Sequence, residues 1–206
     1  MNEDKAEKRR RVGRPRSAES HRAILEATLE LVATHGVQGA SMEAIAAQAG
    51  VGKSTIYRRW SSKDELIVAA LSEFHVQMKF RDTGHFRADL ITSLRDIQQQ
   101  FEAHPLLQRV FLRVMGEATA QPELLQILYE RVLAIRMARM THFFAQAQTR
   151  GELRQDLDPL FAATLILGPL LYNLLIASLF PIPYSVHNLP EQIVDALLPQ
   201  IGAHVE

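Results

Sequence analysis

The stretch AGVGKSTIYRRW, residues 49–60, decides how this chain folds, because its centre is compatible with two unrelated structures. Gly52-Lys53-Ser54 matches the end of a nucleotide-binding phosphate loop, whose full pattern is G-x-x-x-x-G-K-S/T. The first glycine of that pattern would be residue 47, where the chain has Ala47. A phosphate loop also follows a buried strand, whereas the preceding SMEAIAAQA has the apolar spacing of a helix. The pattern therefore disfavours a nucleotide hydrolase.

The same stretch fits the second half of a helix-turn-helix, in which two short helices are joined by a turn containing glycine. We expect Ser41 to cap the first helix and Gly50 to end it. On the second helix, residues 52–60, Ile56 and Trp60 share one face, which can pack on the first helix. The opposite arc suits phosphates and base edges in a major groove, although it could also be the solvated face of an ordinary core helix. The DNA-facing residues predicted there are Lys53, Ser54, Thr55, Tyr57 and Arg58.

Charge is unevenly placed along the 206 residues, although the net charge is zero. Residues 1–65 carry a net charge of +3 and residues 66–206 a net charge of −3. Lys8 to Arg16 holds six basic residues and no acidic one, which is typical either of a solvated tail or, beside a compact motif, of an arm on nucleic acid. The chain has no cysteine, which excludes disulfides and thiolate metal sites. Its first residues lack the apolar core of a signal peptide, so we expect a cytoplasmic protein.

All the apolar patterns along the chain have helical spacing, which predicts an all-α fold of about nine helices. We expect a flexible basic arm over residues 1–17, a helix-turn-helix domain over residues 18–65 and a larger helical domain over residues 66–206. The capping box Ser62-Lys63-Asp64-Glu65 opens a helix predicted to run over residues 62–80 and to join the two domains.

The segment SMEAIAAQAGVGKSTIYRRWSSKDEL, together with the helix before it, resembles the DNA-binding domain of the tetracycline-repressor (TetR) family of bacterial regulators. Gly52 replaces the usual serine at the start of the second helix, and Arg59 stands where an aromatic residue or histidine is common. The resemblance covers roughly residues 18–70, and the remainder is similar to the family in helical content and length. The matching positions are Ser41, Ile45-Ala46, Ala49-Gly50-Val51, Ser54-Thr55-Ile56-Tyr57, Trp60 and Lys63.

The resemblance implies a homodimer that binds a palindromic operator in double-stranded DNA, usually as a repressor released by a small-molecule effector, and not an enzyme. It assigns phosphate contacts to Ser41, Tyr57 and Lys63. The other polar residues of the second helix, Lys53, Ser54, Thr55 and Arg58, would face the groove. The arm RRRVGRPR contains Gly13-Arg14-Pro15, the centre of an AT-hook, although a full hook would have arginine in place of Val12. An extended Arg-Pro arm fits a narrow minor groove. We predict DNA contacts for Arg14 and Arg16 and leave open whether the arm enters that groove.

Leu160 to Phe180 carries no charged residue over 21 residues, a length that could cross a membrane. Pro169, Asn173 and Thr164 interrupt the segment, which argues against a membrane-anchored protein. A helix that is apolar on all sides needs cover on all sides, and a dimer interface supplies it. The resemblance places the dimer helices here and around residues 193–201. The interface residues predicted are Leu170, Leu171, Leu174, Leu175, Ile193 and Leu197.

Large apolar residues on the helices of the C-terminal half could enclose an effector, although residues of this kind are more often plain core. If they form a pocket, we expect an apolar or aromatic effector with few polar groups. The eight histidines show no clustered ligand spacing, so we expect neither a metal nor another cofactor. The pocket residues predicted are Phe101, Gln108, Phe111, Met115, Met137, Met140, Phe144, Leu167, Tyr172 and Asn173.

Overall fold

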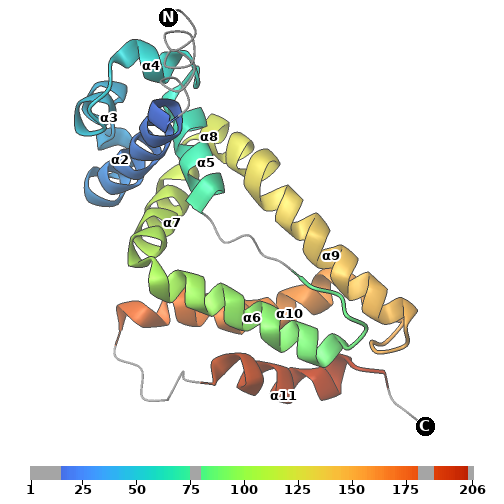
Figure 1. Ribbon diagram of the computed structural model, residues 1–206. Coiled ribbons are helices and arrows are strands. Elements are labelled where there is room, and N and C mark those ends of the chain that lie inside the picture. The colour runs from blue at the N-terminus through green and yellow to red at the C-terminus, as the bar shows by residue number, and fades with distance from the viewer. Residues whose placement is uncertain (1–14, 75–79, 181–187, 204–206) are drawn as a thin grey trace, which may run out of the picture. The chain divides into compact units, whose positions relative to one another are not determined.

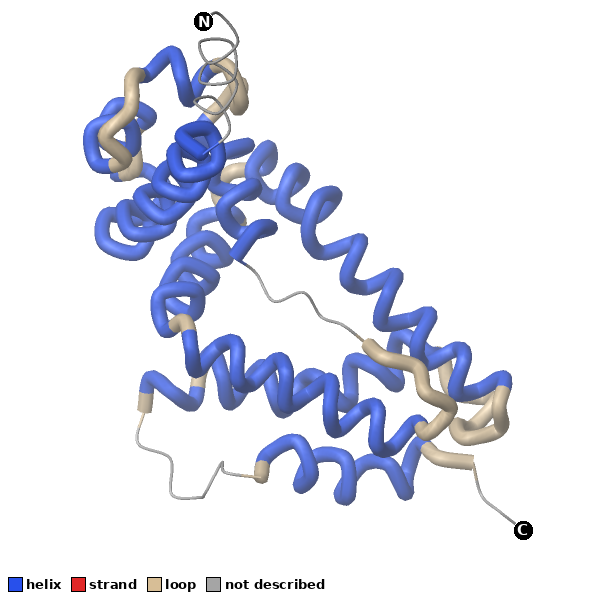
Figure 2. The backbone as a smooth tube through the Cα atoms, in the orientation of Figure 1, coloured by secondary structure: helices blue, strands red, loops and turns tan. Residues whose placement is uncertain are grey.

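The structure is a computed structural model, and it describes residues 15–74, 80–180 and 188–203. In these ranges the chain forms helices joined by turns and loops, and its β-structure is limited to one isolated bridge between Leu153 and Gly202 (Figures 1 and 2). The all-α prediction is confirmed. The helices are α2 Pro15–Gly39, α3 Met42–Gln48, α4 Lys53–Tyr57, α5 Lys63–Phe74, α6 Phe86–Ala103, α7 Pro105–Ala118, α8 Pro122–Leu128, α9 Ala134–Thr149, α10 Pro159–Leu175 and α11 Leu189–Ile201.

Two shorter helical turns complete the described part of the chain. A π-helical turn, Tyr129–Leu133, connects α8 to α9 without a break, so these three segments make one continuous helix. Ala177–Leu179 forms a 3-10 turn after α10. Counted in this way, the described ranges contain nine helices besides the 3-10 turn, as the sequence predicts.

The described residues fall into two compact units, one within Met1–His75 and Arg109–Leu128 and the other within Val76–Gln108 and Tyr129–Glu206. These units do not follow the predicted domain boundaries, because α5, α8 and the part of α7 from Arg109 onward pack in the first unit. The division into an arm, a DNA-binding domain and a regulatory domain therefore remains a prediction about function rather than a description of packing.

The first unit is built around α2, which packs against α3 and α5. Leu25, Leu29 and Val32 repeat at helical spacing on α2 and are buried, as the apolar stripe predicts. Gly36 has φ 75° and ψ 178°, which bends α2, and a further turn follows before the helix ends at Gly39. Helix α5 also packs on α8 within this unit.

The second unit has α10 at its centre, packed on α6, α9 and α11, while α11 also lies along α6 (Figure 1). Phenylalanine rings connect α6 to α9: Phe86 and Phe144 meet edge to face with ring centroids 5.1 Å apart, and Phe143 lies 5.7 Å from Phe144. Such aromatic contacts add to the hydrophobic stabilisation of a core.

The predicted helix over residues 62–80 is wrong at its C-terminal end. Helix α5 ends at Phe74, residues 75–79 lie outside the described residues, and Phe80 is not helical. The ring of Phe80 instead stacks on Phe143 with a centroid distance of 5.1 Å. Burying a large ring against another outweighs helix propensities, which are worth only tenths of a kcal/mol per residue.

The start of the first helix also differs from the expectation. Residues 15–17, assigned to the flexible arm, lie in the first turn of α2. Proline is favoured there because its fixed φ suits a helix and its missing N–H would have no partner in the helix.

Among the described helices, none combines the length and the apolar character that a membrane span requires.

Candidate DNA-binding surface

Helices α3 and α4 form the predicted helix-turn-helix. Ser41 has an extended backbone, and its Oγ accepts a hydrogen bond from the backbone N–H of Ala44 at 3.1 Å, which is the N-cap that the sequence indicates. Gly50 turns the chain with φ 65°, a conformation that favours glycine. Because residues 42–48 are helical, no strand precedes Gly52, and the phosphate-loop reading fails on structure as well as on spacing.

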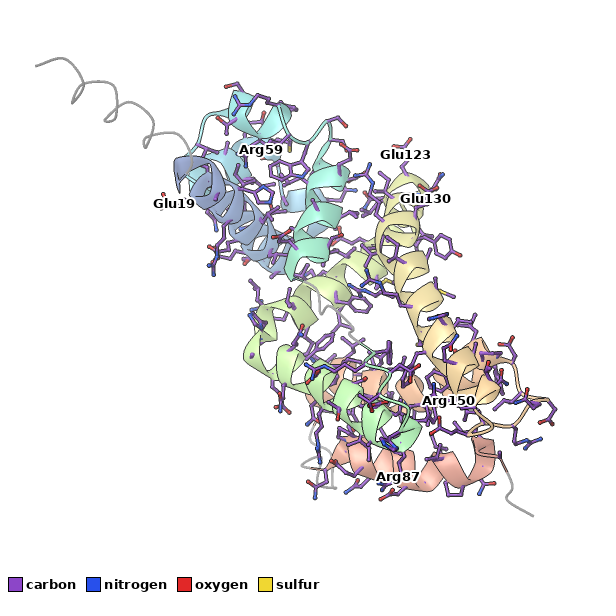
Figure 3. All side chains as sticks on the ribbon, turned by 45° about the vertical axis from the view of Figure 1, so that its right-hand side comes forward. Glu19, Arg59, Arg87, Glu123, Glu130 and Arg150 are labelled. Carbon is purple, nitrogen blue, oxygen red and sulfur yellow. The ribbon has the colours of Figure 1, made fainter. Side chains whose placement is uncertain are left out.

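The second helix of the motif, predicted over residues 52–60, spans only Lys53–Tyr57, and a turn follows it. Helix and turn together separate a buried side from an exposed one. Ile56 is fully buried and Trp60 nearly so, and the ring of Trp60 stacks on His21 of α2 at 5.3 Å. On the other side Ser54 and Arg58 are exposed, and Tyr57 is 51% exposed. Thr55 is half-buried at the edge of this face. Arg59 lies in the turn after α4 (Figure 3).

Lys53 lies on the exposed side of α4 and forms an ion pair with Glu43 of α3, with Nζ and Oε1 2.7 Å apart. The hydrogen bond from Lys53 lowers the pKa of the Glu43 carboxyl, with a smaller contribution from a backbone hydrogen bond. Both side chains are more than half exposed, so the pair contributes little to stability. A DNA phosphate can therefore replace Glu43 as the partner of Lys53 at small cost.

The side chain of Lys63 makes a contact within the first unit. Its Nζ donates a hydrogen bond to the backbone carbonyl of Val37 at 2.8 Å and is partly buried. The phosphate contact predicted for Lys63 stays a prediction, and making it requires this lysine to share or release Val37.

Glu117 of α7 provides a contact that sequence reasoning missed. Its two carboxylate oxygens accept hydrogen bonds from the backbone N–H groups of Val37 and Gln38, each at 3.1 Å. These groups lie just after the bend at Gly36, where a new helical turn starts and its first N–H groups have no partner in the helix. Glu117 therefore caps that turn from 80 residues away in sequence.

The structure describes only one of the two arm residues that are predicted to contact DNA. Arg14 lies outside the described residues, and the backbone of Arg16 lies in the first turn of α2.

The residues predicted to bind an effector are divided between the two units. Gln108 donates to the carbonyl of Leu175 at 3.4 Å, and Asn173 donates to the carbonyl of Pro169 at 2.8 Å, so both amides are used within the chain. Met137 and Tyr172 are exposed, and Phe111 and Met115 lie on the part of α7 that belongs to the first unit. The buried members of the second unit are Phe101, Met140, Phe144 and Leu167.

The residues predicted to form a dimer interface also differ in exposure. Leu170, Leu175 and Ile193 are buried within the chain itself, whereas Leu171, Leu174 and Leu197 are half-exposed. The exposed apolar side chains of α10 and of the residue after it follow a different stripe, at helical spacing. They are Phe161, Leu165, Tyr172 and Ile176.

The fold and this surface define a class of protein. Two short helices meet through a glycine turn, the second helix is fixed by Ile56 and Trp60, and its free face carries hydroxyl, phenol and guanidinium groups. A helix presented in this way can enter the major groove of DNA with its polar face against the bases. The chain is therefore a helix-turn-helix DNA-binding protein.

Comparison with known proteins gives the family. Residues 24–70 match the model of the bacterial regulatory proteins of the tetR family, and residues 80–197 match the tetracyclin repressor-like C-terminal domain. The chain belongs to the TetR family of transcriptional regulators, whose members regulate transcription by binding DNA and are not enzymes.

Individual relatives agree with this assignment. The HTH-type transcriptional regulator YdeS of Bacillus subtilis is 30% identical over 165 residues, covering 80% of this chain and 82% of YdeS. The DNA-binding transcriptional repressor TetR of Mycobacteroides abscessus is 39% identical over 95 residues, covering 45% of this chain and 48% of that protein. Among solved structures, FadR from Bacillus subtilis in complex with stearoyl-CoA superposes with a TM-score of 0.72 at 21% identity, covering 86% of this chain and 96% of FadR.

Proposed function

We propose that this chain is a ligand-responsive repressor that binds a palindromic operator as a homodimer and is released by a small, largely apolar effector. The exposed polar face of α4 carries the DNA-binding part of this proposal, because Ile56 and Trp60 hold the helix while Ser54, Tyr57 and Arg58 stay accessible. In this assignment Arg58 reads a base, and Ser41, Lys53, Thr55 and Lys63 supply phosphate or groove contacts.

The exposed stripe on α10 supports the homodimer. Phe161 is 55% exposed and Tyr172 is 58% exposed, and the polar surface of a monomer seldom carries such large rings in a row. A second copy covering this stripe would bury them. Two reading helices held by a two-fold interface would then enter successive major grooves, roughly 34–36 Å apart.

An apolar effector is supported by the composition of the second unit and by one neighbour. The inner faces of α6, α9 and α10 are almost entirely apolar, with Phe101, Met140, Phe144 and Leu167 buried. FadR of Bacillus subtilis, which shares the fold, is in complex with stearoyl-CoA. The effector can release DNA only if it binds the weakly binding conformation more tightly, since equal affinity for both states shifts nothing.

The proposed dimer is tested with charges on the exposed stripe. The double variant Phe161→Glu, Tyr172→Glu should sediment as a monomer and bind DNA weakly, while its circular dichroism spectrum stays that of the parent because neither side chain is in the core. Thr92→Glu, at an exposed position of α6, is the matched control and should stay dimeric. A double variant that remains dimeric would place the interface elsewhere.

A further inference from the structure

Arg136 lies within the buried face of α9 and its preceding turn. Val132 and Met140, one helical turn to either side, are 4% and 8% exposed, and Phe144, a further turn on, is fully buried. Arg136 itself is only partly exposed. A guanidinium therefore interrupts a stripe that is otherwise apolar.

Within the described residues Arg136 has neither an ion pair nor a hydrogen bond. From Arg131 to Thr149 the chain has three arginines and no aspartate or glutamate, so no position a turn away supplies a carboxylate. Burial, with no compensating partner, lowers the pKa of the Arg136 guanidinium to about 10.

Arg150, in the turn directly after α9, shows the usual arrangement (Figure 3). It pairs with Glu152 at 2.6 Å and with Asp82 at 2.9 Å, and these partners, the hydrogen bond to Glu152 above all, raise its pKa. A buried charge without a partner is costly and is rare in structural positions. The contrast with Arg150 marks Arg136 as a residue whose partner is not part of the described chain.

The backbone next to Arg136 is unusual as well. The π-helical turn Tyr129–Leu133 ends three residues before it, and Glu130 lies in this turn (Figure 3). A π-turn inserts a residue into a helix and shifts the direction of the side chains that follow, and such turns occur frequently at functional sites. The irregularity and the unpaired guanidinium coincide on one stretch of helix.

We propose that Arg136 binds the anionic head of the effector, and that the effector is an amphipathic organic anion with a carboxylate or phosphate head and an apolar body. The proposal rests on the proposed function and specifies its ligand class. Arginine suits either head because its planar donors match two oxygens at once. The apolar residues one turn to either side of Arg136, Val132 and Met140, suit the part of the body next to the head.

The test compares three twelve-carbon probes, dodecanoate, dodecyl phosphate and dodecanol, below their aggregation limits. Thermal unfolding is followed for the parent, for Arg136→Met and for the matched control Arg139→Met, an exposed arginine of the same helix. At about 100 times the dissociation constant, an anionic probe should raise the parent's midpoint by roughly 5–10 °C, and the control should respond equally. The anion that shifts the midpoint more identifies the head group.

Arg136→Met should weaken anion binding about 10–100-fold and leave dodecanol binding unchanged. Without any probe, its midpoint should equal or exceed the parent's, because methionine removes an unpaired, partly buried charge and keeps most of the volume. A structural arginine would give the opposite result in the probe-free measurement.

The proposal is overturned if dodecanol raises the parent's midpoint as much as the anions do, or if neither anion raises it. It is also overturned if the anions raise the midpoint of Arg136→Met as much as that of the parent, or if the probe-free midpoint of Arg136→Met lies clearly below the parent's. Binding of the probe-free proteins to an operator selected from random DNA is measured in parallel. If the parent and Arg136→Met bind that DNA equally, the regulator function stands even where the anion inference fails. If the parent binds no DNA selectively, the proposed function fails instead.

Discussion

Gly36 bends α2 with φ 75° and ψ 178°, a backbone conformation that is essentially confined to glycine. The bend exposes the N–H groups that Glu117 caps, and the same carboxylate lies where a Cβ on residue 36 would be built. Lys63 holds the carbonyl of Val37 from the other side. Two segments, α5 and α7, thus hold one peptide of α2, which joins the three helices in the first unit.

Gly36→Ala should therefore lower the free energy of unfolding by about 1–3 kcal/mol, because the new side chain strains the backbone and displaces Glu117. Gly50→Ala is the matched control: its φ is also positive, but no atom lies within 4 Å of the position of its Cβ, so it should cost less. Urea titration measures both midpoints. Equal losses for the two variants would contradict the role given to Glu117.

At the scale of single residues, the sequence predicts a contact only where the two residues lie close together in the chain. The cap at Ser41 was predicted because Ser41 and Ala44 lie three residues apart in a recognisable pattern. The cap by Glu117 was not, because no periodicity connects residues 37 and 117. Exposure within a hydrophobic helix is also set by distant neighbours: Leu170, predicted to lie in a dimer interface, is buried within the chain, whereas Phe161 of the same helix is 55% exposed.

At the scale of elements, helices α3 and α4 follow from spacing, small residues and glycine, which are local properties. The end of α5 does not: Phe80, which the pattern places in the same helix, is not helical and stacks on Phe143, a residue far along the chain. The first turn of α6 depends both on its local sequence and on a contact with a residue outside the helix. Asp89 is 5% exposed there, and its two oxygens accept hydrogen bonds from the hydroxyl and the backbone N–H of Thr83, each at 2.7 Å.

These contacts predict a pH dependence. Burial on its own opposes ionisation of Asp89, but the hydrogen bonds, those from Thr83 foremost, outweigh it, so the pKa of Asp89 is lower in the folded protein than in the unfolded chain. The ionised form then stabilises the fold above a pH of about 4, and this stabilisation is lost as the pH falls through the lower folded-state pKa.

Asp89→Asn should lower the free energy of unfolding by about 1–3 kcal/mol at pH 7, and the difference from the parent should shrink on acidification. Urea titrations between pH 7 and pH 3 give both quantities. Asp96→Asn, in the same helix, is the control and should not reproduce this pattern. A deficit of Asp89→Asn that grows with acidity would show that the carboxyl is not stabilised in its ionised form.

At the scale of the whole molecule, the account requires two copies of the helix-turn-helix acting on one DNA. The match of residues 24–70 and of residues 80–197 to the two family models fixes the class of regulator. The two-fold arrangement rests on the exposed stripe of α10, and the reading surface rests on α4. A dimer of this kind reads two inverted half-sites, so the symmetry of the preferred DNA reports on both parts of the account at once.

The most direct test of a symmetric dimer that reads DNA with α4 is the selection of bound fragments from random DNA. It is performed with the parent, with Arg58→Ala and with Arg22→Ala. Arg22 is an exposed arginine of α2 paired with Glu26, so its loss changes the charge equally without touching α4. The parent should enrich an inverted repeat whose half-site centres are about one helical turn of DNA, or a multiple of it, apart. Arg58→Ala should bind more weakly by about 1–3 kcal/mol and lose preference at one position in each half-site, whereas Arg22→Ala should select the parent's sequence. No enrichment, a motif without two-fold symmetry, or a preference unchanged in Arg58→Ala would contradict the assignment of α4 as the reading helix of a symmetric dimer.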